Sequence, residues 1–216
     1  MPKGGRGGNG GGGAPGGINP ADVLSTRSLI SERERSERVV DDALQVLSDV
    51  ESQYGVVVED MLVSKIRNRG GGVTLGYYDA EGNIGINEKV FANITGLNKT
   101  YDSSVKTGFH PSRGKKTGLQ AVLAHELGHR LNYVAGGNDW NRLDSTADAI
   151  VKSASNSTGY ANKTRQFRSA ISGYATTNNA EAVAEAFADV YCNGNRAKKE
   201  SRAVVNELNK YFGGNR

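Results

Sequence analysis

The chain has 216 residues, 37% of them hydrophobic, and 27 basic residues against 23 acidic ones give a formal net charge of +4. This length suits one domain that buries its own core, and the single cysteine, Cys192, cannot form an intramolecular disulfide. The charge is too balanced to indicate nucleic-acid binding. The sequence shows neither a signal peptide nor a stretch long enough to cross a bilayer. We therefore expect no membrane span and leave two locations open, the cytoplasm and export without a signal peptide, alone or with a particle.

The chain begins with a glycine-rich tail. Residues 4–17 are mostly glycine, so they offer almost no side chains to bury and would lose much conformational entropy on ordering. We predict that residues 1–20 are disordered and form a tether. One Arg-Gly-Gly triplet, without interleaved aromatic residues, is a weak indication of RNA binding, and we expect no nucleic-acid partner.

Residues 21–55 are predicted to form an N-terminal helical segment. Ser31 and Glu34 have the spacing of a capping box, apolar residues follow at helical spacing, and Gly55 ends the helix. Residues 56–66 are ambiguous between a strand and a short helix.

Residues 72–87 predict two short strands around a turn at residues 79–83, because apolar residues alternate on each side of that turn. Residues 98–116 are predicted to form an irregular loop, since they are polar and interrupted by glycine and proline.

The C-terminal half is predicted to be mainly helical. Thr117 and Gln120 form a second capping-box spacing, and glycines at 136 and 137 end that helix. Residues 138–176 predict one helix near 142–155 followed by a loop, and residues 178–192 predict a strong helix. A last amphipathic helix carries Val204, Val205, Leu208, Tyr211 and Phe212. This order of elements predicts an α+β fold in a single domain over residues 21–216.

The sequence His-Glu-Leu-Gly-His places two of the three histidines, His125 and His129, four residues apart on the predicted helix. Residues at this spacing share one helix face, so both imidazoles can bind one cation. Glu126 lies about 100° around the helix, where it can reach a water molecule on that cation. This is the arrangement of a zinc hydrolase, in which the glutamate acts as general base. Gly128 lets another segment approach the helix closely.

A zinc site of this kind needs a third protein ligand. The longer pattern HExxHxxGxxH is excluded, because Asn132 and Ala135 occupy the glycine and histidine positions. His110 is an alternative, although it lies in a predicted loop beside a proline. A carboxylate from the helix at 178–192 is the better candidate. Glu181 and Glu185 share a face there among small residues that suit close helix packing. One can bind zinc, while the other accepts a hydrogen bond from a ligand histidine.

With HELGH followed by the string E-A-V-A-E-A-F from Glu181, the chain resembles the glutamate zincins, in detail the catalytic-domain family of anthrax lethal factor and related phage and toxin domains. The resemblance covers roughly residues 73–192. It implies a zincin-like fold, one Zn²⁺, Glu181 as third ligand and Glu185 as the supporting carboxylate. It also implies that Tyr174, seven residues before Glu181, stabilises the oxyanion.

On this basis the sequence predicts a zinc-dependent endopeptidase whose partner is a protein or peptide substrate. Residues 56–192 would form the catalytic core and residues 193–216 a C-terminal helix. The resemblance implies that an extended substrate pairs with one strand of the 73–87 hairpin, and we favour residues 83–87 over 73–77. The alternative is a non-catalytic component of a particle or toxin, in which the metal only stabilises the fold.

Overall fold

A computed structural model of the chain describes residues 23–25, 37–58, 60–66, 74–79, 83–91 and 93–213. The elements are β1 (Val23–Ser25), α1 (Glu37–Tyr54), β2 (Asp60–Ser64), β3 (Gly76–Tyr78), β4 (Ile84–Asn87), α2 (Glu88–Phe91), α3 (Ile94–Lys106), α4 (Gly118–Ala135), η2 (Trp140–Arg142), α5 (Leu143–Ser157), α6 (Thr164–Ile171), η3 (Tyr174–Thr176), α7 (Asn179–Asn193), η4 (Gly194–Arg196), α8 (Lys199–Asn209) and η5 (Lys210–Phe212). The predicted tail at 1–20 and the predicted capping box of Ser31 and Glu34 lie outside the described residues.

Four strands form a mixed sheet in the order β1-β2-β4-β3. β2 pairs antiparallel with β1 and parallel with β4, and β3 pairs antiparallel with β4. Met61 lies opposite Ile84 and Val63 opposite Ile86, and all four side chains are buried. Alternate residues of these two strands therefore supply one apolar face to the core. A small mixed sheet combined with helices confirms the predicted α+β class.

Three local predictions differ from the structure. Residues 23–25 form a strand within the segment predicted to be helical, and residues 98–106 belong to α3 rather than to a loop. α3 begins where Asn93 accepts a hydrogen bond from the amide of Gly96, 2.8 Å away, which is an N-cap. Residues 164–171 form α6, where the sequence predicted a loop. The ambiguous stretch at 56–66 contains the strand β2.

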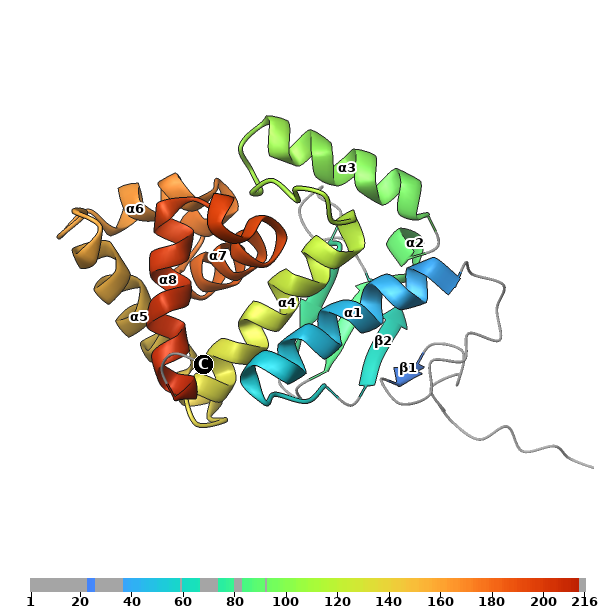
Figure 1. Cartoon of the computed structure of the whole chain (residues 1–216), viewed down its shortest axis with the longest axis horizontal. Helices are drawn as coiled ribbons and strands as arrows, with labels where there is room; N and C mark the ends of the chain where they lie inside the picture. The colour runs from blue at the N-terminus through green and yellow to red at the C-terminus, as the bar shows by residue number, and fades with distance from the viewer. Residues whose placement is uncertain are drawn as a thin grey trace, which may run out of the picture.

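α4 runs through the middle of the molecule, between the strands and the helices α5 to α8 (Figure 1). The predicted capping box at its start is confirmed. Thr117 accepts from the amide of Gln120 at 3.3 Å, and Gln120 accepts from the amide of Thr117 at 3.0 Å. The helix ends at Ala135, before Gly137 with a φ of +80°. α4 contacts α1, α3, β3 and α7, so it is buried on several sides, which explains its many apolar residues.

The helices α5, α7 and α8 pack together on one side of α4 (Figure 1). Val204, Val205 and Leu208 of α8 are buried as predicted, whereas Tyr211, expected on the same apolar face, is exposed. Tyr211 lies in η5, where the tighter winding of a 3-10 helix turns its side chain away from the α-helical stripe. Within the described part of the chain, none of the helices combines the length and hydropathy that crossing a bilayer requires.

Candidate metal centre

The candidate site lies where α4 and α7 cross in close contact. A Cβ atom added to Gly128 of α4 would stand only 2.7 Å from Cα of Ala184 and 3.2 Å from Cβ of Phe187. Ala182 and Ala186, on either side of Ala184, are fully buried. The prediction that Gly128 permits the close approach of another segment is therefore confirmed. The short distance between the two helices brings the carboxylates of α7 within reach of the histidines of α4.

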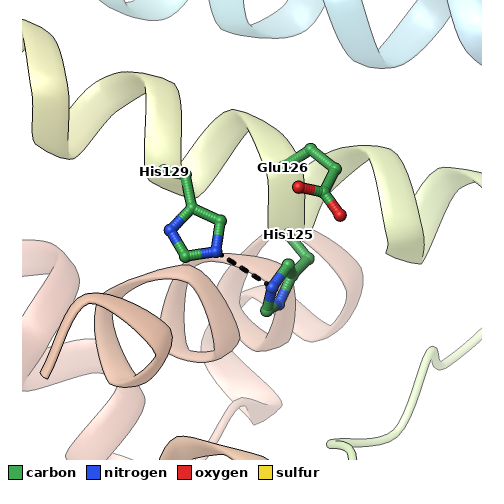
Figure 2. A group of neighbouring side chains, drawn as sticks. All are labelled: His125, Glu126 and His129. Carbon is green, nitrogen blue, oxygen red and sulfur yellow. Dashed lines mark hydrogen bonds between the residues drawn. The ribbon is translucent and has the colours of Figure 1, made fainter. Parts of the chain in front are cut away.

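Three ligand-type atoms meet at this crossing. His125 Nε2 and His129 Nε2 are 3.2 Å apart, and Figure 2 shows both rings projecting from the same side of α4. Glu181 Oε2 from α7 lies 3.2 Å from His125 Nε2 and 3.3 Å from His129 Nε2. The structure thus brings together the three residues that the sequence singled out as ligands.

The size of this triangle fits a zinc ion. Zinc binds nitrogen and oxygen at about 2.0–2.1 Å, and tetrahedral angles then separate two ligand atoms by about 3.3–3.4 Å. The three observed distances of 3.2–3.3 Å are close to this value. Glu181 Oε2 is buried, and apart from its ion-pair contacts with the two imidazoles it has no hydrogen-bond partner among the described residues. A buried carboxylate oxygen in this position is suited to bind a cation.

The start of α7 holds Glu181 in place. Asn178 caps the helix by accepting a hydrogen bond from the amide of Glu181 at 2.8 Å, which places the carboxylate in the first turn, where the helix dipole favours negative charge. Burial alone would raise the pKa of Glu181, but the imidazoles of His125 and His129 outweigh burial and hold this pKa well below its usual range. Glu181 is therefore ionised at neutral pH, as a metal ligand must be.

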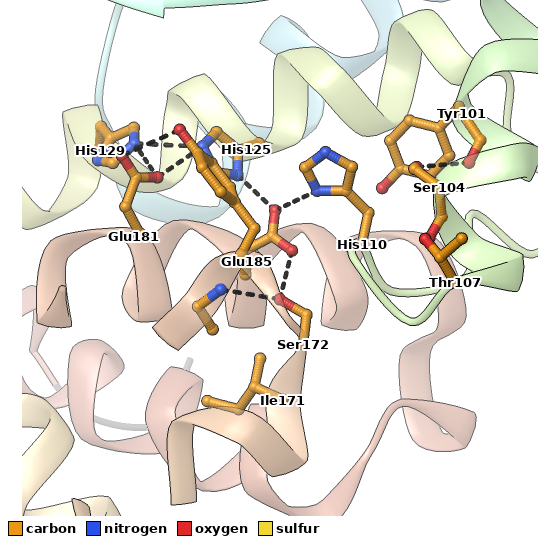
Figure 3. A network of polar contacts seen from close by, with 12 residues as sticks. Tyr101, Ser104, Thr107, His110, His125, His129, Ile171, Ser172, Glu181 and Glu185 are labelled. Atoms are coloured by element: carbon orange, nitrogen blue, oxygen red, sulfur yellow. Dashed lines mark hydrogen bonds and ion pairs between the residues drawn. The ribbon is translucent and has the colours of Figure 1, made fainter. Parts of the chain in front are cut away.

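Glu185 is a fully buried carboxylate that accepts hydrogen bonds from three side chains (Figure 3). Its Oε1 accepts from Nδ1 of His125 at 2.9 Å and from Nδ1 of His110 at 3.0 Å, and its Oε2 accepts from the hydroxyl of Ser172 at 2.6 Å. Burial would raise the pKa of Glu185, but the hydrogen bonds from His110 and His125 lower it to about 2. Since an ionised carboxylate only accepts, Nδ1 of His125 carries a proton, and Nε2 is the ring atom that faces the candidate metal position.

Glu126 is next to His125 in the sequence, but its side chain leaves α4 in a different direction from the two imidazoles (Figure 2). Ligand atoms of His125, Glu126 and His129 all lie within 4.8 Å of one another, whereas Glu181 Oε2 lies 3.2 Å and 3.3 Å from the two imidazole nitrogens at ion-pair distance. We therefore favour Glu181 as the third ligand. Glu126 is buried, and burial raises its pKa despite the two nearby imidazoles. A carboxylate with a raised pKa is a stronger base, which suits proton transfer.

β3 covers Glu126 through Gly76, a residue that sequence reasoning did not single out. A Cβ atom at position 76 would stand 2.9 Å from Glu126 Oε1, 3.0 Å from the carbonyl oxygen of Gly85 and 3.1 Å from Val122. We expect Gly76→Ala to displace the carboxylate of Glu126 without touching the metal ligands. Any hydrolysis that uses Glu126 as its base should slow about 10-fold or more, by analogy with other misplaced catalytic groups, while the amount of zinc that the protein takes up, measured by elemental analysis, stays at the wild-type level. Loss of zinc together with activity would contradict this placement.

Tyr174 lies in η3, directly before α7. Its hydroxyl is 3.4 Å from Glu181 Oε1, and its ring lies 5.7 Å from that of His125. Burial, together with the nearby carboxylates, raises the pKa of Tyr174 to about 12. The hydroxyl therefore keeps its proton at neutral pH and can donate it in a hydrogen bond.

The structure also places His110 and Ser172 in this network, whereas the sequence analysis considered His110 only as an alternative metal ligand and did not single out Ser172. No atom of His110 belongs to the triangle formed by His125 Nε2, His129 Nε2 and Glu181 Oε2. The alternative in which His110 binds the metal directly is therefore not favoured. Both residues come from loops, and their contacts with Glu185 join parts of the chain that no local pattern connects. One usable signal was composition, since the chain has only three histidines and all of them meet here.

The prediction that residues 83–87 offer the free sheet edge is wrong. β4 is paired on both sides, with β2 and with β3, whereas β3 is the outer strand among the described strands. β3 also lies against α4. An extended peptide beside the candidate site would therefore pair with residues 76–78.

No family model matches the chain, and comparisons with the curated proteins and with the solved structures find no match either. The chemistry of the candidate site must accordingly be argued from its own side chains.

Proposed function

We propose that the protein is a zinc-dependent endopeptidase of the glutamate zincin type. The observation that carries the proposal is the triangle of His125 Nε2, His129 Nε2 and Glu181 Oε2, with sides of 3.2–3.3 Å. Two neutral imidazoles and one carboxylate form a known ligand set of catalytic zinc, in which a fourth position stays open for water or substrate. The sequence resemblance to the lethal factor catalytic-domain family supports the same function.

Zn²⁺, when bound, supplies the Lewis acidity that activates a water molecule and polarises the substrate carbonyl. Glu126 accepts the proton of the attacking water and then donates it to the leaving amine. The burial that raises the pKa of Glu126 makes its carboxylate a stronger base for the first transfer, and the protonated carboxyl still donates readily because the leaving amine is a much stronger base. Tyr174 donates its hydroxyl hydrogen to the developing oxyanion, and such donors contribute about 2.7–4 kcal/mol in other enzymes.

The substrate in this proposal is an extended peptide that adds to the outer edge of β3. Main-chain hydrogen bonds to an exposed strand edge give affinity without demanding a particular sequence. β3 begins at Gly76, which lies over Glu126, so a peptide paired with β3 passes close to the general base. This position favours hydrolysis within a chain over removal of a terminal residue.

The direct test measures zinc content and peptide hydrolysis for the wild type and for Glu126→Gln. The wild type should bind about one zinc and cleave members of a broad peptide library. The glutamine variant keeps the shape of the side chain but cannot accept the proton, so cleavage should fall at least about 100-fold while zinc content stays the same. The two proteins should also unfold at similar temperatures.

Two outcomes would contradict the proposal. Binding of one zinc without cleavage of any library member by either protein would favour the alternative, a non-catalytic component stabilised by its metal. Equal cleavage by the wild type and Glu126→Gln would show that Glu126 is not the base.

A further inference from the structure

We propose that His110 is a positioning residue of the metal centre, which acts through Glu185 to hold the imidazole of His125 in its metal-binding orientation. This inference rests on the proposed zinc site, although not on peptide hydrolysis. His110 lies on the opposite side of Glu185 from His129 (Figure 3). It therefore contacts Glu185 on the side away from the candidate metal position and is not itself a ligand.

The two histidines share one carboxylate oxygen. Nδ1 of His110 and Nδ1 of His125 both donate to Oε1 of Glu185, at 3.0 Å and 2.9 Å, while Ser172 donates to Oε2. The donor from Ser172 fixes one oxygen, and the donor from His110 fixes the direction of the other. Rotation of the Glu185 carboxylate would break both of these bonds as well as the bond to His125.

The ring of His110 is itself held firmly. It stacks on Tyr101 of α3 with ring centroids 5.4 Å apart and an interplanar angle of 12°, and it packs against Phe109 at an angle of 74° with ring centroids 4.9 Å apart. Its side chain is 15% exposed. The ring of His110, packed against α3, and the carboxylate of Glu185 on α7 therefore determine together where the imidazole of His125 can point.

The chain next to His110 also holds the loop that carries Tyr174. The amide of Gly173 donates to the carbonyl of Gly108 at 2.8 Å, and the amide of Tyr174 donates to the carbonyl of Phe109 at 2.9 Å. The ring of Tyr174 lies 5.4 Å from that of His110. His110 thus sits at a junction between the segment that supports His125 and the segment that presents Tyr174.

A matched pair of variants separates the hydrogen bond of His110 from its packing. His110→Phe keeps a ring that can stack on Tyr101 but removes the donor to Glu185. His110→Asn loses the ring, but its amide nitrogen can occupy the position of Nδ1 and donate to Glu185. Zinc affinity is measured for both variants by competition with a chelator, and the visible spectrum of the Co²⁺-substituted protein reports the geometry of the bound metal.

We expect His110→Phe to weaken zinc binding about 10-fold, at the lower end of the effect of residues that support metal ligands, and to shift the cobalt spectrum. His110→Asn should stay within about twofold of the wild type on the same scale and keep the wild-type spectrum. Equal losses in both variants, or a larger loss in His110→Asn, would show a packing role and overturn the inference.

The same measurements separate this inference from the proposed function. If the wild type binds zinc and cleaves peptides, but neither variant changes zinc affinity, the inference fails and the proposed function stands. If zinc affinity follows the expected order while the wild type cleaves no peptide, the inference stands and the proposed function fails.

Discussion

Glu181→Ala is expected to lower zinc affinity by roughly 100- to 1000-fold. Zinc sites with four protein ligands bind with about 10–16 kcal/mol, so each ligand accounts for roughly 2.5–4 kcal/mol. Glu181 Oε2 lies 3.2 Å and 3.3 Å from the two imidazole nitrogens and has no hydrogen-bond partner among the described residues. Its removal takes away a ligand, and it also leaves the half-buried hydroxyl of Tyr174 without its acceptor Glu181 Oε1, 3.4 Å away. Competition with a chelator of known affinity measures the loss.

Glu185→Ala is the matched control, since it removes a carboxylate one helical turn further along α7. Its zinc affinity should fall about 10- to 100-fold, the range for residues that orient a ligand. The same change leaves His110, His125 and Ser172 without their buried acceptor, so it should destabilise the zinc-free protein more than Glu181→Ala does. If Glu185→Ala weakened zinc binding as much as Glu181→Ala or more, the assignment of Glu181 as the third ligand would be wrong.

Gly128→Ala is expected to destabilise the folded protein by about 1–3 kcal/mol, the usual cost of overpacking a core. The new Cβ would stand 2.7 Å from Cα of Ala184, and a backbone atom in a helix cannot move aside alone. α7 must shift as a whole, which carries Glu181 and Glu185 away from the histidines. Zinc affinity should therefore fall in parallel with stability.

Whether Gly128→Ala lowers or raises the stability of the folded protein distinguishes between two expectations. Helix propensity alone predicts that alanine in place of glycine stabilises a helix by about 0.5–1 kcal/mol. Denaturant unfolding of the zinc-free protein separates the two expectations, because close packing and propensity act in opposite directions. A stabilised Gly128→Ala variant with unchanged zinc affinity would mean that α4 and α7 are further apart than described.

Sequence reasoning located the features that depend on local helical geometry. His125 and His129 are four residues apart, as are Glu181 and Glu185, and an α-helix places such residues on one face whatever surrounds it. The capping box at Thr117 is equally local. The close packing of α4 on α7 was indicated by Gly128 and by the run of alanines in α7.

Contacts between distant segments were beyond that reasoning. The bond from His110 to Glu185 and the cover of Gly76 over Glu126 join parts of the chain that no periodicity connects. The edge of the sheet was misplaced for the same reason. β2 inserts parallel to β4, and hydrophobic alternation within residues 72–87 does not reveal a third strand at the side of a hairpin. The helix α3 was missed because its many polar residues resemble a loop.

Because α4 and α7 contact each other directly, the number of residues between them can differ among related chains without changing the centre. The short sequence spacings in the centre, from His125 to His129, from Tyr174 to Glu181 and from Glu181 to Glu185, lie within single elements or between adjacent ones. The turn between α5 and α6, which includes Gly159 with a φ of +86° and Asn162 with a φ of +60°, takes no part in that contact. Residues inserted in this exposed turn would lengthen the gap between His129 and Tyr174 while the ligand atoms kept their separation. Related sequences are therefore best sought by the two short motifs separately, with the number of residues between them left free.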